Sequence, residues 1–160
     1  MKKIIIYALL GLFSYYGFKA LTMESVSPET MSAMSADDSQ CANKSHCVIF
    51  YLAPWCPSCK TALRYLDTFS EVLPEYDAGL KIIIGMDSAD KLERMADQIA
   101  SPVIYDLDKK YVTEFEINRV PRVVLINQNG TILKQENFLY WRTNKTDSVR
   151  KYITEILELE

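Results

Sequence analysis

A short apolar run that leads directly into a pair of cysteines constrains the fold of this chain more than any other stretch. Val48–Ala53 is rich in β-branched and aromatic residues, which predicts a buried strand. The sequence then reads Pro-Trp-Cys-Pro-Ser-Cys, and apolar positions recur at helical spacing from Ser58 to Val72. A strand, a tight turn and a helix therefore place Cys56 and Cys59 at the start of the helix.

The position of Cys56 at a helix start predicts a reactive sulfur. Unpaired N–H groups and the positive end of the helix stabilise an anion there, which favours a thiolate nucleophile. Cys59 lies one turn further along and can reach the same sulfur. We expect Cys56 to attack a substrate disulfide and Cys59 to resolve the mixed disulfide, which leaves a Cys56–Cys59 redox disulfide. Pro57 suits the first helical turn, where its missing N–H costs nothing.

Considered by itself, a Cys-x-x-Cys pair is open to two other interpretations. It could be a static disulfide, or it could supply half of a zinc site, in which such pairs are common. The strand before Cys56 and the helix after Cys59 favour redox chemistry over both. We therefore expect neither a metal nor a cofactor at the pair.

The remainder of the chain predicts an α/β domain with the order β-α-β-α-β-α-β-β-α. Helical crossovers imply parallel strands and the late hairpin adds an antiparallel edge, so we expect a mixed sheet with helices on both faces. Pro74 should stop the first helix. Further strands are expected at Leu80–Gly85, Pro102–Tyr105, Arg122–Ile126 and Thr131–Lys134. Further helices are expected after a cap at Asp87 or Ser88 with Leu92, Met95, Ala96 and Ile99 inside, at Tyr111–Phe115, and from Thr146 to Leu159.

Two stretches resemble the hallmarks of the thioredoxin superfamily. VIFYLAPWCPSCK, from Val48, is similar to its active-site strand, turn and helix. INRVPRVVLINQNGTIL, from Ile117, is similar to the segment in which a cis peptide bond precedes a proline beside the active site. The resemblance implies that Pro121 faces the cysteine pair and that the backbone at Arg119 and Val120 is free to pair with an extended substrate. Without the cysteine motif, Pro121 would read as an ordinary edge-strand proline.

The resemblance spans Val48 to Leu159 and implies a thioredoxin-like fold with an extra strand and helix before Pro121. Those additions are similar to the ones in membrane-tethered, extracytoplasmic thioredoxin-like proteins with reductive tasks. The implied activity is thiol–disulfide exchange with protein disulfides, as a reductant supplied by a membrane electron partner. Trp55 is implied to shield the site and contact partners, although simple packing is an alternative.

Two departures from the thioredoxin pattern leave the direction of electron flow open. Phe50 stands where thioredoxin keeps a buried acid, so the proton acceptor is unassigned. Pro57–Ser58 replaces the Gly–Pro dipeptide of thioredoxin. An oxidant or isomerase role is therefore the near alternative to a reductant, and a cysteine-rich metal-binding module is a more distant one.

The first 22 residues predict a signal-anchor or signal peptide rather than part of the fold. Lys2 and Lys3 precede an apolar run that reaches residue 21 if Lys19 extends to the headgroups. Small residues are poorly placed for cleavage, so we favour an anchor through residues 4–21. The paired lysines keep the N-terminus in the cytoplasm, which puts the domain on the periplasmic side, anchored to the inner membrane or secreted.

Residues 23–45 predict a flexible tether and residues 46–160 the thioredoxin-like domain. Cys41 and Cys47 bracket five residues just before the first strand. They could form a structural disulfide, serve as a second redox pair, or join His46 in a metal site.

With 18 basic and 21 acidic residues and no basic stripe, the chain is not expected to bind nucleic acid.

Overall fold

The computed structural model describes residues 41–138 and 145–157, with the Lys145 side chain excepted. All of them belong to the second of two compact units, Met31–Glu160. The predicted membrane segment and the tether as far as residue 40 lie outside the described residues. Among the residues that are described, no helix is both long enough and apolar enough to cross a membrane.

A five-stranded mixed sheet with the order β3-β2-β1-β4-β5 forms the centre of the domain. β1 pairs in parallel with β2, and β2 with β3. β4 is antiparallel to both β1 and β5. The strands are β1 His46–Leu52, β2 Ala78–Gly85, β3 Val103–Asp106, β4 Arg122–Asn127 and β5 Ile132–Asn137.

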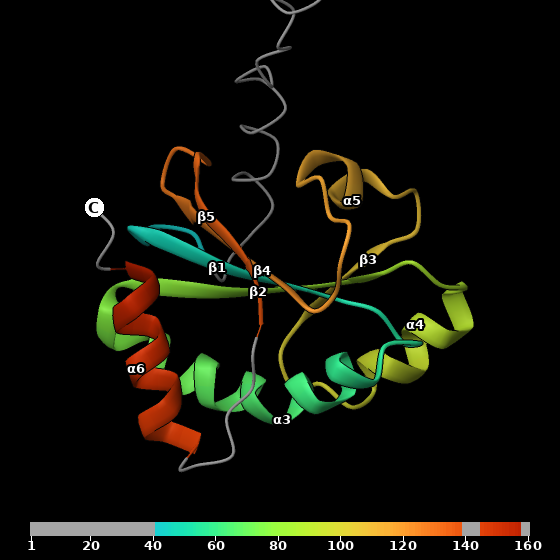
Figure 1. Cartoon of the computed structure of the whole chain (residues 1–160), viewed down its shortest axis with the longest axis horizontal. Coiled ribbons are helices and arrows are strands. Elements are labelled where there is room, and N and C mark those ends of the chain that lie inside the picture. Colours follow the sequence, from blue (N-terminus) through green and yellow to red (C-terminus); the bar gives the residue numbers. More distant parts are fainter. Residues whose placement is uncertain (1–40, 139–144, 158–160) are drawn as a thin grey trace, which may run out of the picture. The chain divides into compact units, whose positions relative to one another are not determined.

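Helices cover both faces of the sheet, which confirms the predicted α/β class. Figure 1 shows α3, α4 and α6 on one face and α5 on the other. β3 and α5 precede β4, so they are the strand and helix expected before Pro121. The helices are α3 Pro57–Val72, the 3-10 helix η1 Leu73–Tyr76, α4 Ala89–Ala96, α5 Lys110–Glu114 and α6 Lys145–Leu157.

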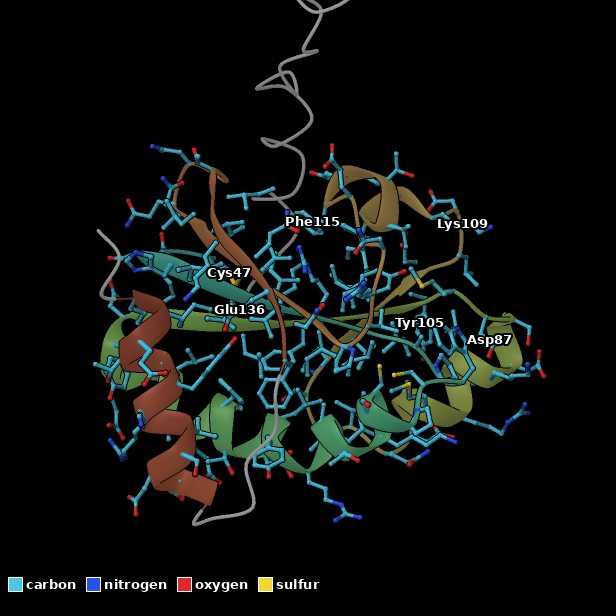
Figure 2. All side chains as sticks on the ribbon, viewed as in Figure 1. Cys47, Asp87, Tyr105, Lys109, Phe115 and Glu136 are labelled. Carbon is cyan, nitrogen blue, oxygen red and sulfur yellow. A yellow bond between two sulfur atoms is a disulfide. The ribbon has the colours of Figure 1, made fainter. Side chains whose placement is uncertain are left out.

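β1 is buried on both faces, which explains why its sequence is a continuous apolar run rather than an alternating one. Phe50 faces α3 and α6 and makes edge contacts with Phe69 and Phe138 at ring-centroid distances of 4.9 Å and 5.2 Å. Tyr51 faces the other way, into a smaller cluster with Phe115. Figure 2 shows Phe115 on the α5 side of the sheet. The two clusters hold the end of β1 from both sides.

Some boundaries differ from those predicted. α3 ends at Val72, just before Pro74, as predicted, but a 3-10 turn, η1, follows it, with Pro74 near the start of η1, where no N–H is needed. This 3-10 turn ends at Asp77, in the left-handed region. α4 ends at Ala96, so Ile99 packs against the core from the following turn. β5 begins one residue later than predicted and continues to Asn137.

A buried carboxylate connects α5 to the sheet. Asp106, at the end of β3, is 2% exposed and accepts the Tyr51 hydroxyl at 2.8 Å. It also accepts the backbone N–H groups of Tyr111 and Val112, both at 3.1 Å. Burial, and then the bond to Asp106, raise the pKa of Tyr51. One side chain thus satisfies a buried hydroxyl and the first turn of a five-residue helix.

Replacing Asp106 by alanine should therefore lower the free energy of unfolding by about 3 kcal/mol, because three hydrogen bonds are lost and a buried hydroxyl is left unpaired. Urea denaturation monitored by circular dichroism measures the change. Asp108→Ala is the matched control, since Asp108 is exposed and accepts the Lys110 N–H at 3.3 Å. Equal losses from the two substitutions would contradict the anchoring role of Asp106.

Candidate active site

Cys56 is the N-cap residue of α3, with extended backbone angles of φ −88° and ψ 116°. Its Sγ accepts the backbone N–H of Cys59 at 3.2 Å. Its own S–H lies 3.5 Å from the Val120 carbonyl oxygen. The sulfur therefore meets a donor from the helix start and an acceptor from the loop before β4. Both Cys56 and Cys59 are free thiols in this structure.

Cys59 is fully buried, whereas Cys56 retains 5% exposure. The Cys59 Sγ accepts the Ala53 N–H at 3.4 Å. Burial raises the pKa of the Cys59 thiol, the neighbouring Cys56 adds to the increase, and the Ala53 N–H only partly offsets it. The two thiols are thus unequal: the Cys56 thiol caps the helix start and is slightly less buried, and the Cys59 thiol is held protonated one turn below it.

The peptide bond between Val120 and Pro121 is cis, as the resemblance implied. β1 and β4 are antiparallel, with Tyr51 opposite Arg122, so this bond lies beside the end of β1 that leads to Cys56. The Pro121 carbonyl accepts the Phe138 N–H at 3.1 Å. Val120 approaches the Cys56 sulfur through its carbonyl oxygen.

Trp55 is 57% exposed, the position expected for a residue that contacts partners rather than the core. Its indole N–H donates to the Met86 carbonyl at 3.1 Å. Met86 follows β2 and has a φ of 61°, in the left-handed region. The sequence did not predict this contact of Met86 with Trp55, because methionine is not a residue that favours the left-handed conformation. The bond fixes the indole next to Cys56.

The acid that thioredoxin keeps beneath its cysteines has no counterpart at Phe50, which lies in an aromatic cluster. Asp106 is buried, but it does not replace that acid. It bonds to Tyr51, which packs on the α5 face of the sheet, whereas Cys59 packs on the α3 face. The sheet therefore separates Asp106 from the buried thiol.

Cys41 and Cys47 form a disulfide with a Cα–Cα distance of 5.4 Å. Cys47 is near the start of β1 and Cys56 follows its end, so the strand rise separates the two pairs by roughly 15 Å. That separation excludes direct exchange between them in this conformation. Among residues 41–138 and 145–157, no group of three or more histidine, cysteine or acidic side chains could hold a metal ion.

The sequence profile of the redoxin family, described as Redoxin, matches residues 24–141. The sporulation thiol-disulfide oxidoreductase A of Bacillus subtilis is 22% identical over 111 residues, which cover 65% of this chain and 67% of that relative.

Solved structures share the fold at low identity. The crystal structure of StoA from Bacillus subtilis has a TM-score of 0.53 at 17% identity and covers 70% of this chain and 85% of its own. A secreted Mycobacterium tuberculosis disulfide oxidoreductase, homologous to Escherichia coli DsbE, has a TM-score of 0.53 at 15% identity, with 67% and 81% covered. Since the family profile extends over most of the sequence, the chain belongs to the redoxin family and is a thioredoxin-like thiol–disulfide oxidoreductase.

Proposed function

We propose that the chain exchanges disulfides with exported proteins through its Cys-Pro-Ser-Cys motif, and that it acts as a reductant. The observation that carries this proposal is the inequality of the two thiols. Cys56 is the less buried of the two residues, and its sulfur accepts the N–H of Cys59 at the helix start. Cys59 is fully buried one turn below and comes into use only after Cys56 has reacted.

In the proposed first step, the Cys56 thiolate attacks one sulfur of a substrate disulfide. An S–S bond forms between Cys56 and that sulfur, and the second substrate sulfur leaves as a thiolate that takes up a proton. Cys59 then loses its proton and attacks the Cys56 sulfur, which releases the first substrate sulfur as a thiol. Two electrons and two protons have moved to the substrate, and the chain holds a Cys56–Cys59 disulfide.

Four residues are proposed to hold the substrate around Cys56. Trp55 provides an exposed apolar rim, and Pro57 is exposed in the first turn of α3. An extended substrate segment would run along Val120 and Pro121, whose backbone approaches the Cys56 sulfur. A strand-like segment there would present its own sulfur to the nucleophile.

We infer the reductant role from the strand and helix before Pro121, β3 and α5, which resemble the additions in membrane-tethered thioredoxin-like proteins with reductive tasks. The predicted anchor at residues 4–21 would place the domain outside the cytosol, where a membrane electron donor would return the Cys56–Cys59 disulfide to two thiols.

The Cys59→Ser variant should accumulate mixed disulfides with protein substrates, because the resolving sulfur is gone. Non-reducing electrophoresis followed by mass spectrometry detects them on Cys56. The Cys56→Ser variant is the control and should trap none. Trapping by Cys56→Ser at the same level would reverse the proposed order of attack.

Alkylation should also distinguish the two thiols. In the reduced protein at pH 8, iodoacetamide should modify Cys56 at least about tenfold faster than Cys59, whose raised pKa and burial keep it protonated. Peptide mapping by mass spectrometry gives both rates. As the pH rises further, the Cys59 rate should increase, since its thiolate forms only above the usual range. Similar rates at pH 8 would contradict the proposed roles.

The reduction potential of the Cys56–Cys59 pair tests the direction of electron flow. We expect a value closer to that of thioredoxin, about −270 mV, than to that of the oxidant DsbA, about −120 mV. Equilibration with glutathione or dithiothreitol buffers, with tryptophan fluorescence as the readout, measures it. A potential close to that of DsbA would refute the reductant role and leave an oxidant.

A further inference from the structure

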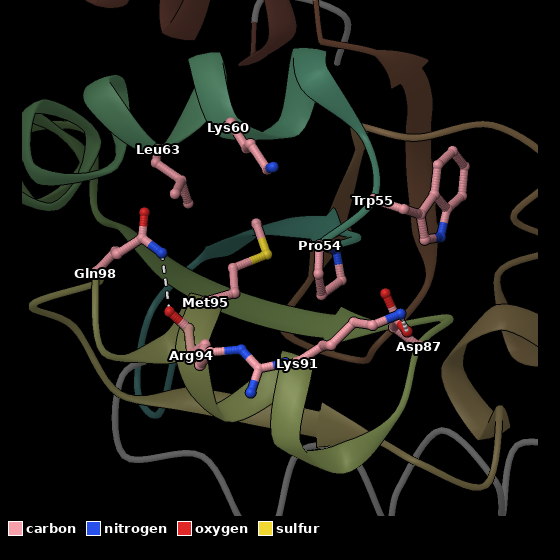
Figure 3. Close-up of a pocket in the computed structure, with 9 residues that line it drawn as sticks. All are labelled: Pro54, Trp55, Lys60, Leu63, Asp87, Lys91, Arg94, Met95 and Gln98. Carbon is pink, nitrogen blue, oxygen red and sulfur yellow. Dashed lines mark hydrogen bonds and ion pairs between the residues drawn. The ribbon is translucent and has the colours of Figure 1, made fainter.

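A pocket of about 450 Å³ lies between the start of α3 and α4, beside Trp55. Figure 3 shows Leu63 and Lys60 on the α3 side of the pocket and Met95, Lys91 and Arg94 on the α4 side, with Lys91 turned toward Asp87. Its size suits one or two side chains of a bound peptide. The pocket adjoins the proposed site, because Trp55 lines it and directly precedes Cys56.

The charge of this pocket is opposite to that of the chain. Three cations, Lys60, Lys91 and Arg94, line it with a single carboxylate, Asp87, whereas the whole chain has a net charge of −3. Asp87 is already paired with Lys91 at 2.8 Å. Arg94 forms an ion pair with Asp90, which is exposed, at 3.3 Å, and its charge also acts on Asp87.

Lys60 is the cation closest to the chemistry. Its backbone N–H donates to the Cys56 carbonyl at 3.2 Å, so it lies in the first turn of α3. The structure shows no ion pair for Lys60 among the residues that it describes. The first turn of α3 contains no acidic residue. Lys60 therefore adds to the positive end of the helix instead of offsetting it, which makes the pocket more attractive to an anion.

We propose that this pocket is a recognition subsite for an acidic side chain, carried by the protein whose disulfide reacts at Cys56. Lys60 and Arg94 would pair with the carboxylate. Leu63 and Met95 would contact the methylene groups of its stem. An aspartate or glutamate a few residues from the reactive cysteine would reach the pocket past Trp55. This inference rests on the proposed function, and it names a substrate class that the function by itself does not specify.

Two disulfide-bonded peptides test the subsite, identical except that glutamates near one cysteine of the first are glutamines in the second. The full chain should reduce the acidic peptide with a kcat/KM at least about threefold higher, the scale of a few exposed ion pairs. The preference should fall as KCl is raised, because salt screens such pairs.

Lys60→Gln and Arg94→Gln should each bring the ratio of the two kcat/KM values toward one, and Arg94→Glu should take it below one. The ratio is the readout because any effect of Lys60 on the reactivity of Cys56 alters both rates equally. Lys151→Gln is the matched control, since Lys151 is an exposed lysine on α6 outside the pocket, and it should leave the ratio unchanged.

Reduction of both peptides at equal efficiency by the unaltered chain would overturn the subsite while leaving the proposed function intact. If both Lys60→Gln and Arg94→Gln still preferred the acidic peptide, the subsite would be overturned as well, since the acidic side chain would then bind at another place on the protein. Failure to reduce either peptide would instead contradict the proposed function, and the subsite with it.

Discussion

The junction of β1 and α3 is the constraint on which the site depends. There the backbone N–H of Cys59 donates to the Cys56 sulfur at 3.2 Å, as a side-chain cap does at an ordinary helix start. The geometry holds only if the strand end is immobile. β1 meets this requirement because it is buried on both faces and paired on both edges. The packing of β1 in the core therefore fixes the position of Cys56, because only a short turn separates Leu52 from Cys56.

The strand order explains what surrounds Cys56. β2 and β4 are the two neighbours of β1, and the chain leaves or enters each of them at the same end of the sheet. From the β2 side, Met86 holds Trp55. From the β4 side, Val120 meets the sulfur. The Cys56 sulfur therefore lies between Trp55 and Val120, which we propose hold the substrate, and the pocket lined by Trp55 continues toward α4.

The two faces of the sheet have different tasks. The α3 face holds Cys59 and the aromatic cluster around Phe50. The α5 face holds Asp106, which satisfies Tyr51 and the start of α5. A buried carboxylate is costly unless its oxygens are bonded, and here both are. The Asp106 carboxylate stabilises the packing of α5 on the sheet, and the sheet separates it from the Cys59 thiol.

Sequence alone determined the strands, the helices and the cysteine pair, because hydrophobic period and turn residues are local signals. The apolar run Val48–Ala53 predicted a buried strand, which the structure forms as β1, and the cysteine shortly after it caps the next helix. Tertiary structure decided what those signals do not encode. The left-handed Met86 that holds Trp55, the carboxylate of Asp106 at the start of α5, and the position of Lys60 and Arg94 around one pocket each depend on segments distant in sequence. Only the folded sheet brings such segments together, since their contacts follow from strand order rather than from any local pattern.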